Sequence, residues 1–484
     1  MSTKKLVLFI IACFVAMVTV HAVYAADDSD INTRLEKVEK DVSAMKEQTK
    51  GEPWLSRDKK DTGLTWNFSG GKVTLYGLAD VSVDYVTNGL GSGVRNGLQQ
   101  KGNNGWQPQI SSNLSYFGIR GSRQIAGENL QAVFQFETEV AYSYTPGPTS
   151  DSQVKNGLGS RNSYLGLAGH WGAVKVGKTD APYKTSTAMM DPFDRTPADY
   201  NSIIGNTGGD NRAEFDTRLP HVVWYESPRF FGLNLGLLWM PGQNRDNSNE
   251  IYAQGETNCT GGNNAPCNDG SYGNAYSVAL SYTQGPVYLV TAYEFHKNVN
   301  RTGDQVPDAN DVTPVTGVHN EWAWKIGGQG KIDVTNTVVS VLYEKTKRVD
   351  AVAQFDERSR PNAYYLSITQ YIDASHANEI DFAWAHAGKT PGDPGGVSNR
   401  APGYVSGPID NRSDLLALGV KHNFPDKKTT VYLVGCEQLN HEGAHYDLGA
   451  SGHGIAVDDK DDGGVNTFAG AHLKAISMGM RYSF

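Results

Sequence analysis

Near the C-terminus, five consecutive residues have the letters of a zinc-protease motif: His441-Glu442-Gly443-Ala444-His445. In that chemistry both histidines bind zinc from one face of a stable helix, and a third ligand lies further along the chain. The motif here lies in a glycine-rich segment, residues 441–454, in which a helix is poorly supported. With His453 close by, this segment suits adventitious surface metal binding better than catalysis. No serine lies in a nucleophile elbow either, so we predict that the protein is not an enzyme and has no cofactor and no catalytic metal.

Two of the four cysteines could form a disulfide. Cys259 and Cys267 lie eight residues apart in a polar stretch, which suits a loop-closing bond in an oxidising compartment. A zinc site is weakly supported, because neither residue belongs to a close cysteine pair and no second pair follows. Cys436 lies in an apolar run and is interpreted as a buried or lipid-facing hydrophobe.

The composition excludes several classes of protein. A mean hydropathy of -0.46 and the lack of repeated long apolar runs exclude a bundle of transmembrane helices. An aromatic content of 10% provides too much buriable surface for a disordered chain. The net charge of -9 argues against nucleic acid as a partner. A folded protein rich in strands remains.

Residues 1–71 precede the part of the chain in which apolar and polar residues alternate. Residues 1–25 have a basic start, an apolar middle and a small-residue cleavage pattern, and they predict a secretory signal peptide rather than a retained anchor. Residues 26–50 predict a coiled-coil helix, whose seam is Ile31, Leu35, Val38, Val42 and Met45. A single amphipathic helix packed on its own domain is the alternative. Residues 51–71 are interpreted as a linker.

From residue 72 onward, apolar and polar residues alternate with period two. In the last run, Ile476, Met478 and Met480 share one face, while Ser477 and Arg481 share the other. Sixteen such runs can be placed between residues 72 and 484, and short connections alternate with long polar ones. Short turns at one end and long loops at the other are typical of a transmembrane barrel, not of a soluble sandwich. The predicted fold is therefore an all-β, sixteen-stranded antiparallel transmembrane β-barrel, preceded by the short N-terminal helix.

Several of these runs resemble a known family. The segments that carry the resemblance are 73–80 (VTLYGLAD), 116–122 (YFGIRGS), 130–137 (LQAVFQFE), 163–169 (SYLGLAG), 172–178 (GAVKVGK) and the terminal Phe484 preceded by Tyr482. In this order they resemble the general trimeric porins of Gram-negative outer membranes, of the kind found in Neisseria and the beta-proteobacteria. The resemblance covers roughly residues 72–484, whereas the N-terminal heptads are not part of the ordinary family pattern.

The resemblance implies three barrels per assembly, each with a loop that folds inward at about residues 180–220 and narrows its pore. In the family this loop is acidic and faces basic residues on the wall, which produces a transverse field that orients solutes and selects ions. The loop candidates are Asp191, Asp194, Asp199, Glu214, Asp216 and Arg218, and the wall candidates are Arg120, Arg161 and Lys178, with Lys175 and Arg481 as further possibilities. Tyr116 and Trp224 occupy positions where relatives carry basic residues. These two aromatic residues could provide a stacking surface for a ring-shaped solute, or they could belong to the aromatic girdle at the rim.

We therefore expect a passive outer-membrane channel for ions and small hydrophilic solutes, with the N-terminal helix in the periplasm. A substrate-specific channel and a structural tether between membrane and cell wall are the alternatives. The expected partners are two further copies of the chain, outer-membrane lipid and lipopolysaccharide, and peptidoglycan if the N-terminal helix reaches it. Ion selectivity and the natural solute do not follow from the sequence.

Overall fold

The computed structural model describes most of the barrel and few of its long connections. The described residues are 63–87, 94–95, 98–99, 106–127, 130–140, 142, 159–205, 215–241, 269–271, 274–301, 319–349, 359–391, 410–441, 444, 446, 448–449 and 472–484. The signal peptide, the coiled-coil seam, Cys259, Cys267 and Glu214 lie outside these ranges, so what was expected of them stays a prediction.

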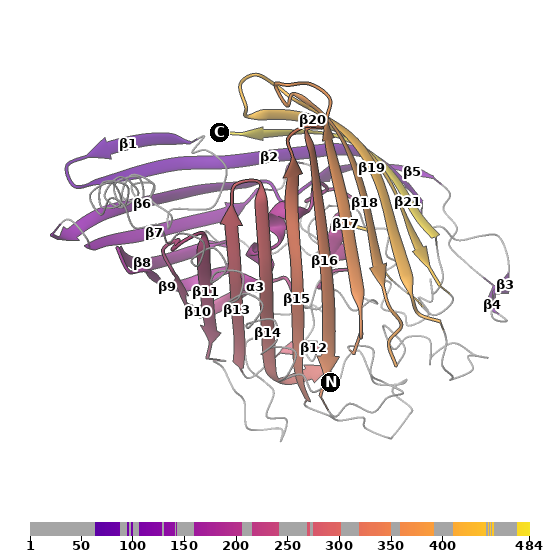
Figure 1. The fold of residues 1–484 in the computed structure, drawn as a ribbon, viewed down its shortest axis with the longest axis horizontal. Helices are drawn as coiled ribbons and strands as arrows, with labels where there is room; N and C mark the ends of the chain where they lie inside the picture. The colour runs from indigo at the N-terminus through magenta and orange to yellow at the C-terminus, as the bar shows by residue number, and fades with distance from the viewer. Residues whose placement is uncertain are drawn as a thin grey trace, which may run out of the picture. The chain divides into compact units, whose positions relative to one another are not determined.

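Sixteen strands form a closed antiparallel ring, as predicted. They are β2 (Gly71–Thr87), β6 (Tyr116–Ala126), β7 (Leu130–Glu139), β8 (Ser163–Gly169), β9 (Gly172–Asp180), β10 (Arg218–Glu226), β11 (Leu233–Met240), β13 (Asn274–Gln284), β14 (Val287–Arg301), β15 (His319–Ile332), β16 (Thr337–Arg348), β17 (Ala363–Tyr371), β18 (Asn378–Ala387), β19 (Ser413–Asn423), β20 (Thr429–Asn440) and β21 (His472–Ser483). Each strand pairs with the next, and β21 pairs with β2 to close the ring (Figure 1). Closure satisfies the backbone groups of both edges, which a lipid environment requires.

Five short strands supplement the ring. β5 (Gln107–Ser112) pairs with the second half of β2, β12 (Asp269–Ser271) pairs with β14, and β3 (Val94–Arg95) pairs with β4 (Leu98–Gln99). β1 (Leu64–Phe68) pairs with the start of β2. The prediction of a linker through residue 71 is therefore wrong for these five residues and for Gly71, because they join the sheet.

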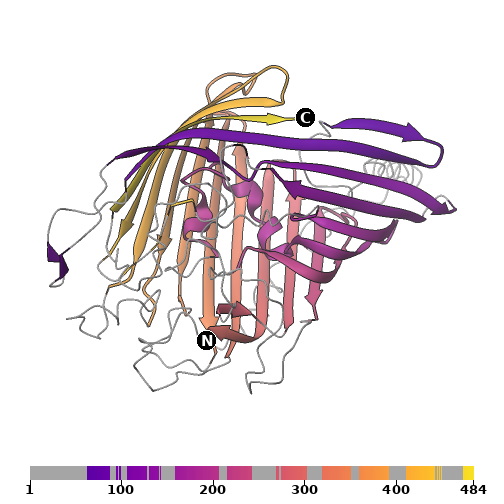
Figure 2. The same ribbon diagram turned by 180° about the vertical axis from the view of Figure 1, so that it is seen from behind.

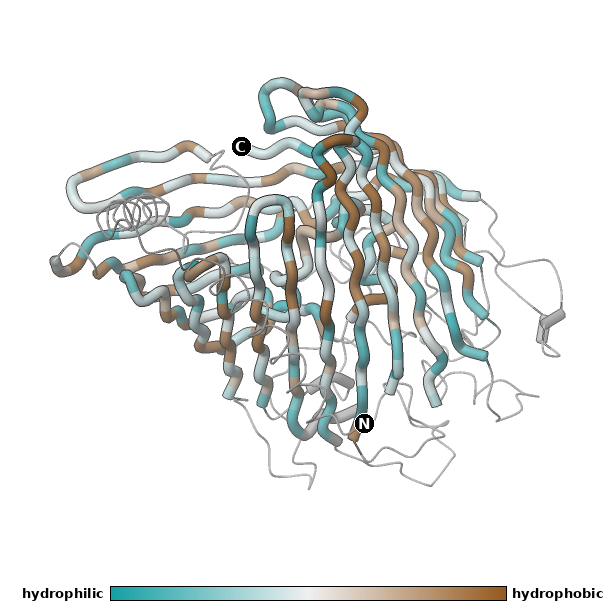
Figure 3. Tube along the Cα trace, in the orientation of Figure 1, coloured by the Kyte–Doolittle hydropathy of each residue, from teal (hydrophilic) through white to brown (hydrophobic). Residues whose placement is uncertain are grey.

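Side chains alternate across the wall in the predicted sense. On β21, Ile476, Met478 and Met480 are 49%, 67% and 53% exposed, whereas Ala475 and Ser477 on the other face are buried. Figure 3 shows the same alternation of apolar and polar residues along the strands. The outward face is thus apolar and the inward face is mostly small or polar, which is the arrangement that hydrocarbon outside and water inside require.

The short turns join strands at one rim of the ring, and some of them need unusual backbone conformations. Gly285 in the β13–β14 turn has φ 55°, and Asn336 in the β15–β16 turn has φ 53°. Glycine and asparagine adopt this left-handed conformation at low cost. Among the described residues, no helix is long and apolar enough to cross a membrane.

Candidate functional site

The connection between β9 and β10 is the longest described segment without strands. It begins with helix α3 (Pro182–Thr185), for which Pro182 supplies a suitable first residue, and continues with two 3-10 turns, η1 (Ala188–Met190) and η2 (Tyr200–Ser202). We call its described residues, 181–205 and 215–217, the inner loop. Figure 2 shows its short helices in front of the strands on the inner side of the sheet.

The first part of the inner loop is bonded to inward-facing residues of three strands. The Tyr183 amide donates to Ser277 Oγ on β13 at 2.9 Å, and its hydroxyl donates to Glu344 on β16 at 2.7 Å. The hydroxyl of Tyr288 on β14 donates to the Ser186 carbonyl at 2.5 Å. These bonds hold α3 against the wall.

The second part continues along the wall to the last strand. From β17, Ser367 donates to the Met190 carbonyl at 2.8 Å and Tyr365 donates to Asp191 at 2.7 Å. Lys421 on β19 donates to the Pro192 carbonyl at 2.6 Å, and Arg481 on β21 donates to the Asp194 carbonyl at 2.8 Å. The inner loop therefore follows the inner face of the ring from β13 to β21.

Two of the predicted loop carboxylates are buried within the loop itself. Asp191 accepts bonds from the amides of Phe193 and Tyr200, and Asp199 accepts from the amides of Arg195 and Asn201. Burial raises the pKa of Asp191 to about 6, and burial together with the charge of Asp191 raises the pKa of Asp199. These hydrogen bonds show that both carboxyl groups hold the shape of the loop. Their assignment to the pore lining stays a prediction.

Asp216 and Lys325 form a buried pair between the inner loop and the wall. Lys325 on β15 forms an ion pair with Asp216, donates to Thr187 at 2.7 Å and lies 4.0 Å from the Tyr183 ring centroid. Burial raises the pKa of Asp216, and the charge of Lys325 opposes this shift. Asp216 therefore anchors the loop by a charged contact with the wall.

Glu344 on β16 accepts hydrogen bonds from several residues that attach the inner loop to the wall. Besides Tyr183, it accepts from the Gly205 amide at 3.0 and 2.9 Å and from Arg360 at 2.5 Å. Arg360 also donates to Tyr446 from the last long connection at 3.3 Å. Glu344 thus joins two parts of the inner loop to the wall through one fully buried carboxylate.

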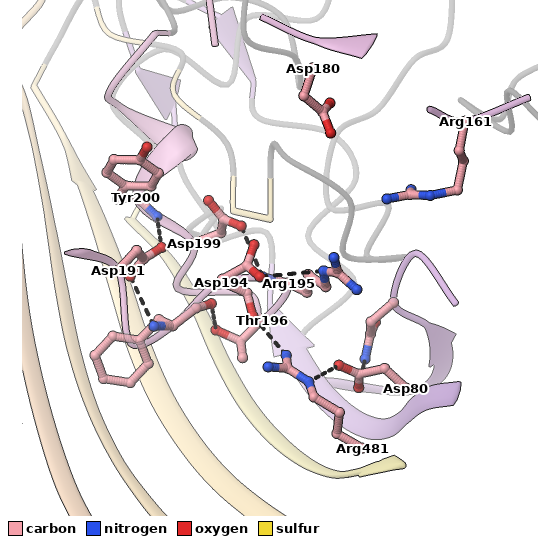
Figure 4. A network of polar contacts seen from close by, with 12 residues as sticks. Asp80, Arg161, Asp180, Asp191, Asp194, Arg195, Thr196, Asp199, Tyr200 and Arg481 are labelled. Carbon is pink, nitrogen blue, oxygen red and sulfur yellow. Dashed lines mark hydrogen bonds and ion pairs between the residues drawn. The ribbon is translucent and has the colours of Figure 1, made fainter. Parts of the chain in front are cut away.

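The loop presents one exposed ion pair. Asp194 and Arg195 lie 3.3 Å apart, with side chains 49% and 18% exposed (Figure 4). Arg195 has φ 65°, a conformation that is uncommon for a bulky residue. Arg481 bonds both the Asp194 carbonyl and Asp80 of β2, at 2.8 and 2.7 Å, so it ties the loop to the seam where the barrel closes. Asp194 is the predicted loop carboxylate that remains accessible within the described part.

The predicted wall cations are close to carboxylates or aromatic rings. Arg161 lies 2.6 Å from Glu137, and Lys175 lies 2.9 Å from Glu226. Arg218, which was predicted in the loop, is the first residue of β10 and lies 3.2 Å from Asp180. Arg120 lies over the Tyr76 ring at 4.5 Å. The carboxylates therefore partly neutralise Arg161, Lys175 and Arg218.

Lys178 differs from the prediction. Along β9 it has the phase of Val174 and Val176, which are 39% and 55% exposed, whereas the buried Lys175 has the opposite phase. In a strand, side chains two residues apart share a face, so the predicted inward direction of Lys178 is wrong. Lys175 lies on the inward face instead.

Both predicted aromatic residues contact cations. Arg161 and Arg195 lie 4.9 and 5.4 Å from the Tyr116 ring centroid, so one guanidinium comes from the wall and one from the loop. Trp224 donates to Glu226 at 2.9 Å, lies 5.8 Å from Lys175 and is only 3% exposed. Trp224 is therefore an inward residue, and its ring supports Lys175.

Several important residues were not predicted from the sequence. Lys325 and Glu344 lie in phase with the small inward residues of β15 and β16, such as Ala323 and Ser340. A charged residue within an inward row was the signal that could have identified them. Arg195 carried no comparable signal, because an irregular loop has no period.

If the chain forms the channel that its sequence predicts, the exposed Asp194–Arg195 pair of the inner loop leads to a prediction about ion selectivity. Arg195→Gln should shift the reversal potential in a salt gradient toward cation preference, and Asp194→Asn should shift it the opposite way. One unit charge about 10 Å from a permeating ion in water contributes about 0.4 kcal/mol, so each change in permeability ratio should be about twofold. Equal shifts of the same sign for both variants would contradict this assignment.

A family model matches most of this chain, and curated relatives match parts of it. Residues 61–444 match the family model described as Gram-negative porin. Major outer membrane protein P.IA of Neisseria meningitidis serogroup C is 29% identical over 200 residues, which cover 40% of this chain and 46% of the relative. Outer membrane porin protein 32 of Delftia acidovorans is 27% identical over 165 residues, which cover 34% of this chain and 42% of the relative. The chain thus spans about half the length of these curated relatives.

A solved structure has the same fold. The anion-selective porin from Comamonas acidovorans aligns with a TM-score of 0.57 at 20% sequence identity, over 86% of this chain and 100% of that chain.

Proposed function

Because the chain belongs to the Gram-negative porin family, we propose that it forms a water-filled channel in the outer membrane for the passive diffusion of ions and small hydrophilic solutes. The inner loop is the constriction of this channel. It reduces the cross-section of the lumen, and the Asp194–Arg195 pair and Tyr116 line the opening, while the buried Arg161 supports the Tyr116 ring. Passage requires no covalent step and no cofactor.

One observation supports the constriction above all others. The inner loop is bonded to side chains of β13, β14, β16, β17, β19 and β21, all of which project from the inner face of the ring. A loop attached along this path occupies part of the lumen. The buried carboxylates Asp191, Asp199 and Asp216 stabilise it there, so the field of the opening depends on few exposed charges.

We also propose that the channel is a trimer. Three copies form the channel, each with its own pore, surrounded by outer-membrane lipid and lipopolysaccharide. The signal peptide (1–25) directs export, and the helix of residues 26–50 forms a three-stranded coil in the periplasm, where it could contact peptidoglycan.

Planar-bilayer recordings test the channel and separate it from the two alternatives. Stepwise conductance in groups of three supports a trimeric diffusion channel. Saturable block by one solute would favour a substrate-specific channel, and a silent bilayer would favour a structural tether.

Deletion of residues 27–50 tests the coiled coil separately. We expect unchanged single-channel conductance and a lower melting temperature of the trimer, because the seam residues would no longer contribute to association. A trimer of unchanged thermal stability would refute the proposed role of this segment.

A further inference from the structure

The last long connection turns back into the ring after β20. Ala444, Tyr446 and Leu448 are fully buried, although they follow the end of that strand. The side chain of Asn440, an inward residue of β20, accepts from the Tyr446 amide at 3.1 Å and donates to the Tyr446 carbonyl at 2.8 Å. Because both bonds come from an inward side chain, this part of the connection lies inside the ring. We call residues 444, 446, 448 and 449 the return segment.

Tyr446 extends from β20 toward β16 across a row of small side chains. Strand pairing places these residues opposite one another in the order Asn440, Ser413, Ala387, Ala363 and Glu344. The row spans four strand spacings, which correspond to about 19 Å along the wall. At its far end the Tyr446 hydroxyl accepts from Arg360 at 3.3 Å, and Arg360 donates to Glu344 at 2.5 Å. The small residues between the two ends therefore leave room for the tyrosine ring.

The return segment also contacts the inner loop. The Gly449 amide donates to the Pro197 carbonyl at 3.0 Å. Leu448 and Tyr446 belong to one hydrophobic cluster with four buried residues of the inner loop, namely Phe193, Ala198, Ile203 and Ile204. The two connections are thus packed together inside the ring.

The wall beneath these two connections is apolar. The same cluster contains inward residues of four neighbouring strands: Ala383, Ala385 and Ala387 on β18, Leu415 and Ala417 on β19, Val434 and Cys436 on β20, and Leu473 and Ala475 on β21 (Figure 1). By contrast, inward residues on β6, β7, β9 and β10 include the charged Arg120, Glu137, Lys175 and Glu226. Apolar side chains are stable on an inner face where other apolar groups exclude water. One sector of the ring interior is therefore a packed core.

We propose that the return segment and the inner loop together close the sector of the lumen beside β17 to β20, so that solutes pass along the charged inner faces of β6 to β10. This inference deepens the proposed channel function and rests on it. Tyr446 is a positioning residue, because its side chain lies across the row of small wall residues and joins the return segment to Arg360. The size limit of the channel then depends on two connections instead of one.

Protection of a thiol beneath Tyr446 tests the proposal. Ala387→Cys is introduced into the full-length protein together with Cys259→Ser, Cys267→Ser and Cys436→Ala, so that it is the only cysteine after residue 25. Ala387 is fully buried, and Asp194 is 49% exposed. A sulfonate-bearing thiol reagent should therefore modify Ala387→Cys at least about a hundredfold more slowly than Asp194→Cys in the same background, because access requires a local opening. Mass spectrometry of the folded, detergent-solubilised protein measures both rates.

Variants of Tyr446 show whether this residue provides the protection. Adding Tyr446→Ala should accelerate the modification of Ala387→Cys at least about tenfold, whereas Tyr446→Phe keeps the ring and should keep the slow rate. The matched control is Tyr164→Ala, which removes a buried inward tyrosine from β8, where its ring lies 5.3 Å from that of Trp224. This control should leave Ala387→Cys protected. In planar bilayers, the double variant Tyr446→Ala, Leu448→Ala should increase the single-channel conductance by up to about twofold, because the closed sector would join the passage.

Three results would overturn the inference: rapid modification of Ala387→Cys with Tyr446 intact, an unchanged slow rate after Tyr446→Ala, or an equal acceleration by Tyr164→Ala. The comparison of Ala387→Cys with Asp194→Cys needs no change at Tyr446, so it decides the question even if Tyr446→Ala does not fold. A protected thiol with a silent bilayer would refute the channel alone. A conducting channel with an unprotected thiol would refute this inference alone.

Discussion

Replacement of Glu344 by alanine is expected to lower the free energy of unfolding by about 3–5 kcal/mol, because it leaves a buried guanidinium without its carboxylate. Arg360 would lose its 2.5 Å contact, and Tyr183 and Gly205 would lose their acceptor. The inner loop would then be attached to the wall at fewer points. We therefore also expect larger single-channel conductance with more current noise, measured in planar bilayers alongside urea unfolding in vesicles.

Two further variants separate the effect of Glu344 on stability from its effect on conductance. Glu437→Ala removes a carboxylate from a partly exposed ion pair with Lys474 and should cost no more than about 1 kcal/mol. The double variant Glu344→Ala, Arg360→Met removes the unpaired charge and should recover much of the stability, while the altered conductance remains. If the conductance returned to the wild-type value in the double variant, Glu344 would not act as an anchor of the loop.

Met478→Arg is expected to cost about 2–4 kcal/mol when the protein is unfolded from lipid vesicles, because it places a charge on the apolar face near the middle of β21. Met478 is 67% exposed, and its cross-strand partners Val83 and Leu433 are 59% and 47% exposed on the same face. This exposure is stable only if hydrocarbon surrounds the wall.

Tyr482→Arg is the matched control for Met478→Arg. Tyr482 has the same outward phase but lies at the end of β21, where an arginine should cost about 0–1 kcal/mol. Similar losses for both variants, or none for Met478→Arg, would show that the outer face does not meet hydrocarbon.

The barrel could be predicted from the sequence because its pattern is local and repeated. Alternation on β21 separates Met478 from Ser477, and the same separation of faces recurs on other ring strands, such as β13 and β16. Short turns such as the one around Gly285 then give the order of the strands. Closure between β2 and β21 follows from the need to satisfy both edges in lipid.

The candidate site was less predictable, since its contacts depend on residues far apart in the chain. Glu344 and Tyr183 are separated by 161 positions, and Arg481 and Asp194 by 287. Asp191 was expected to line the pore, but it is buried and accepts hydrogen bonds from amides of its own loop. An irregular loop has no repeating pattern in the sequence that shows which of its side chains are buried. Lys178 was expected to point inward by its match to the family and by its phase, but along β9 it has the phase of the exposed Val174 and Val176.

The central claim is that the inner loop narrows a hydrated lumen, and thiol modification at its tip tests this claim most directly. Asp194→Cys introduces a thiol at a position that is 49% exposed in the native side chain. Addition of a sulfonate-bearing thiol reagent during bilayer recording should reduce the current of this variant in discrete steps, and it should leave the wild-type current unchanged. Complete modification of the introduced thiol with no change in current would contradict the account.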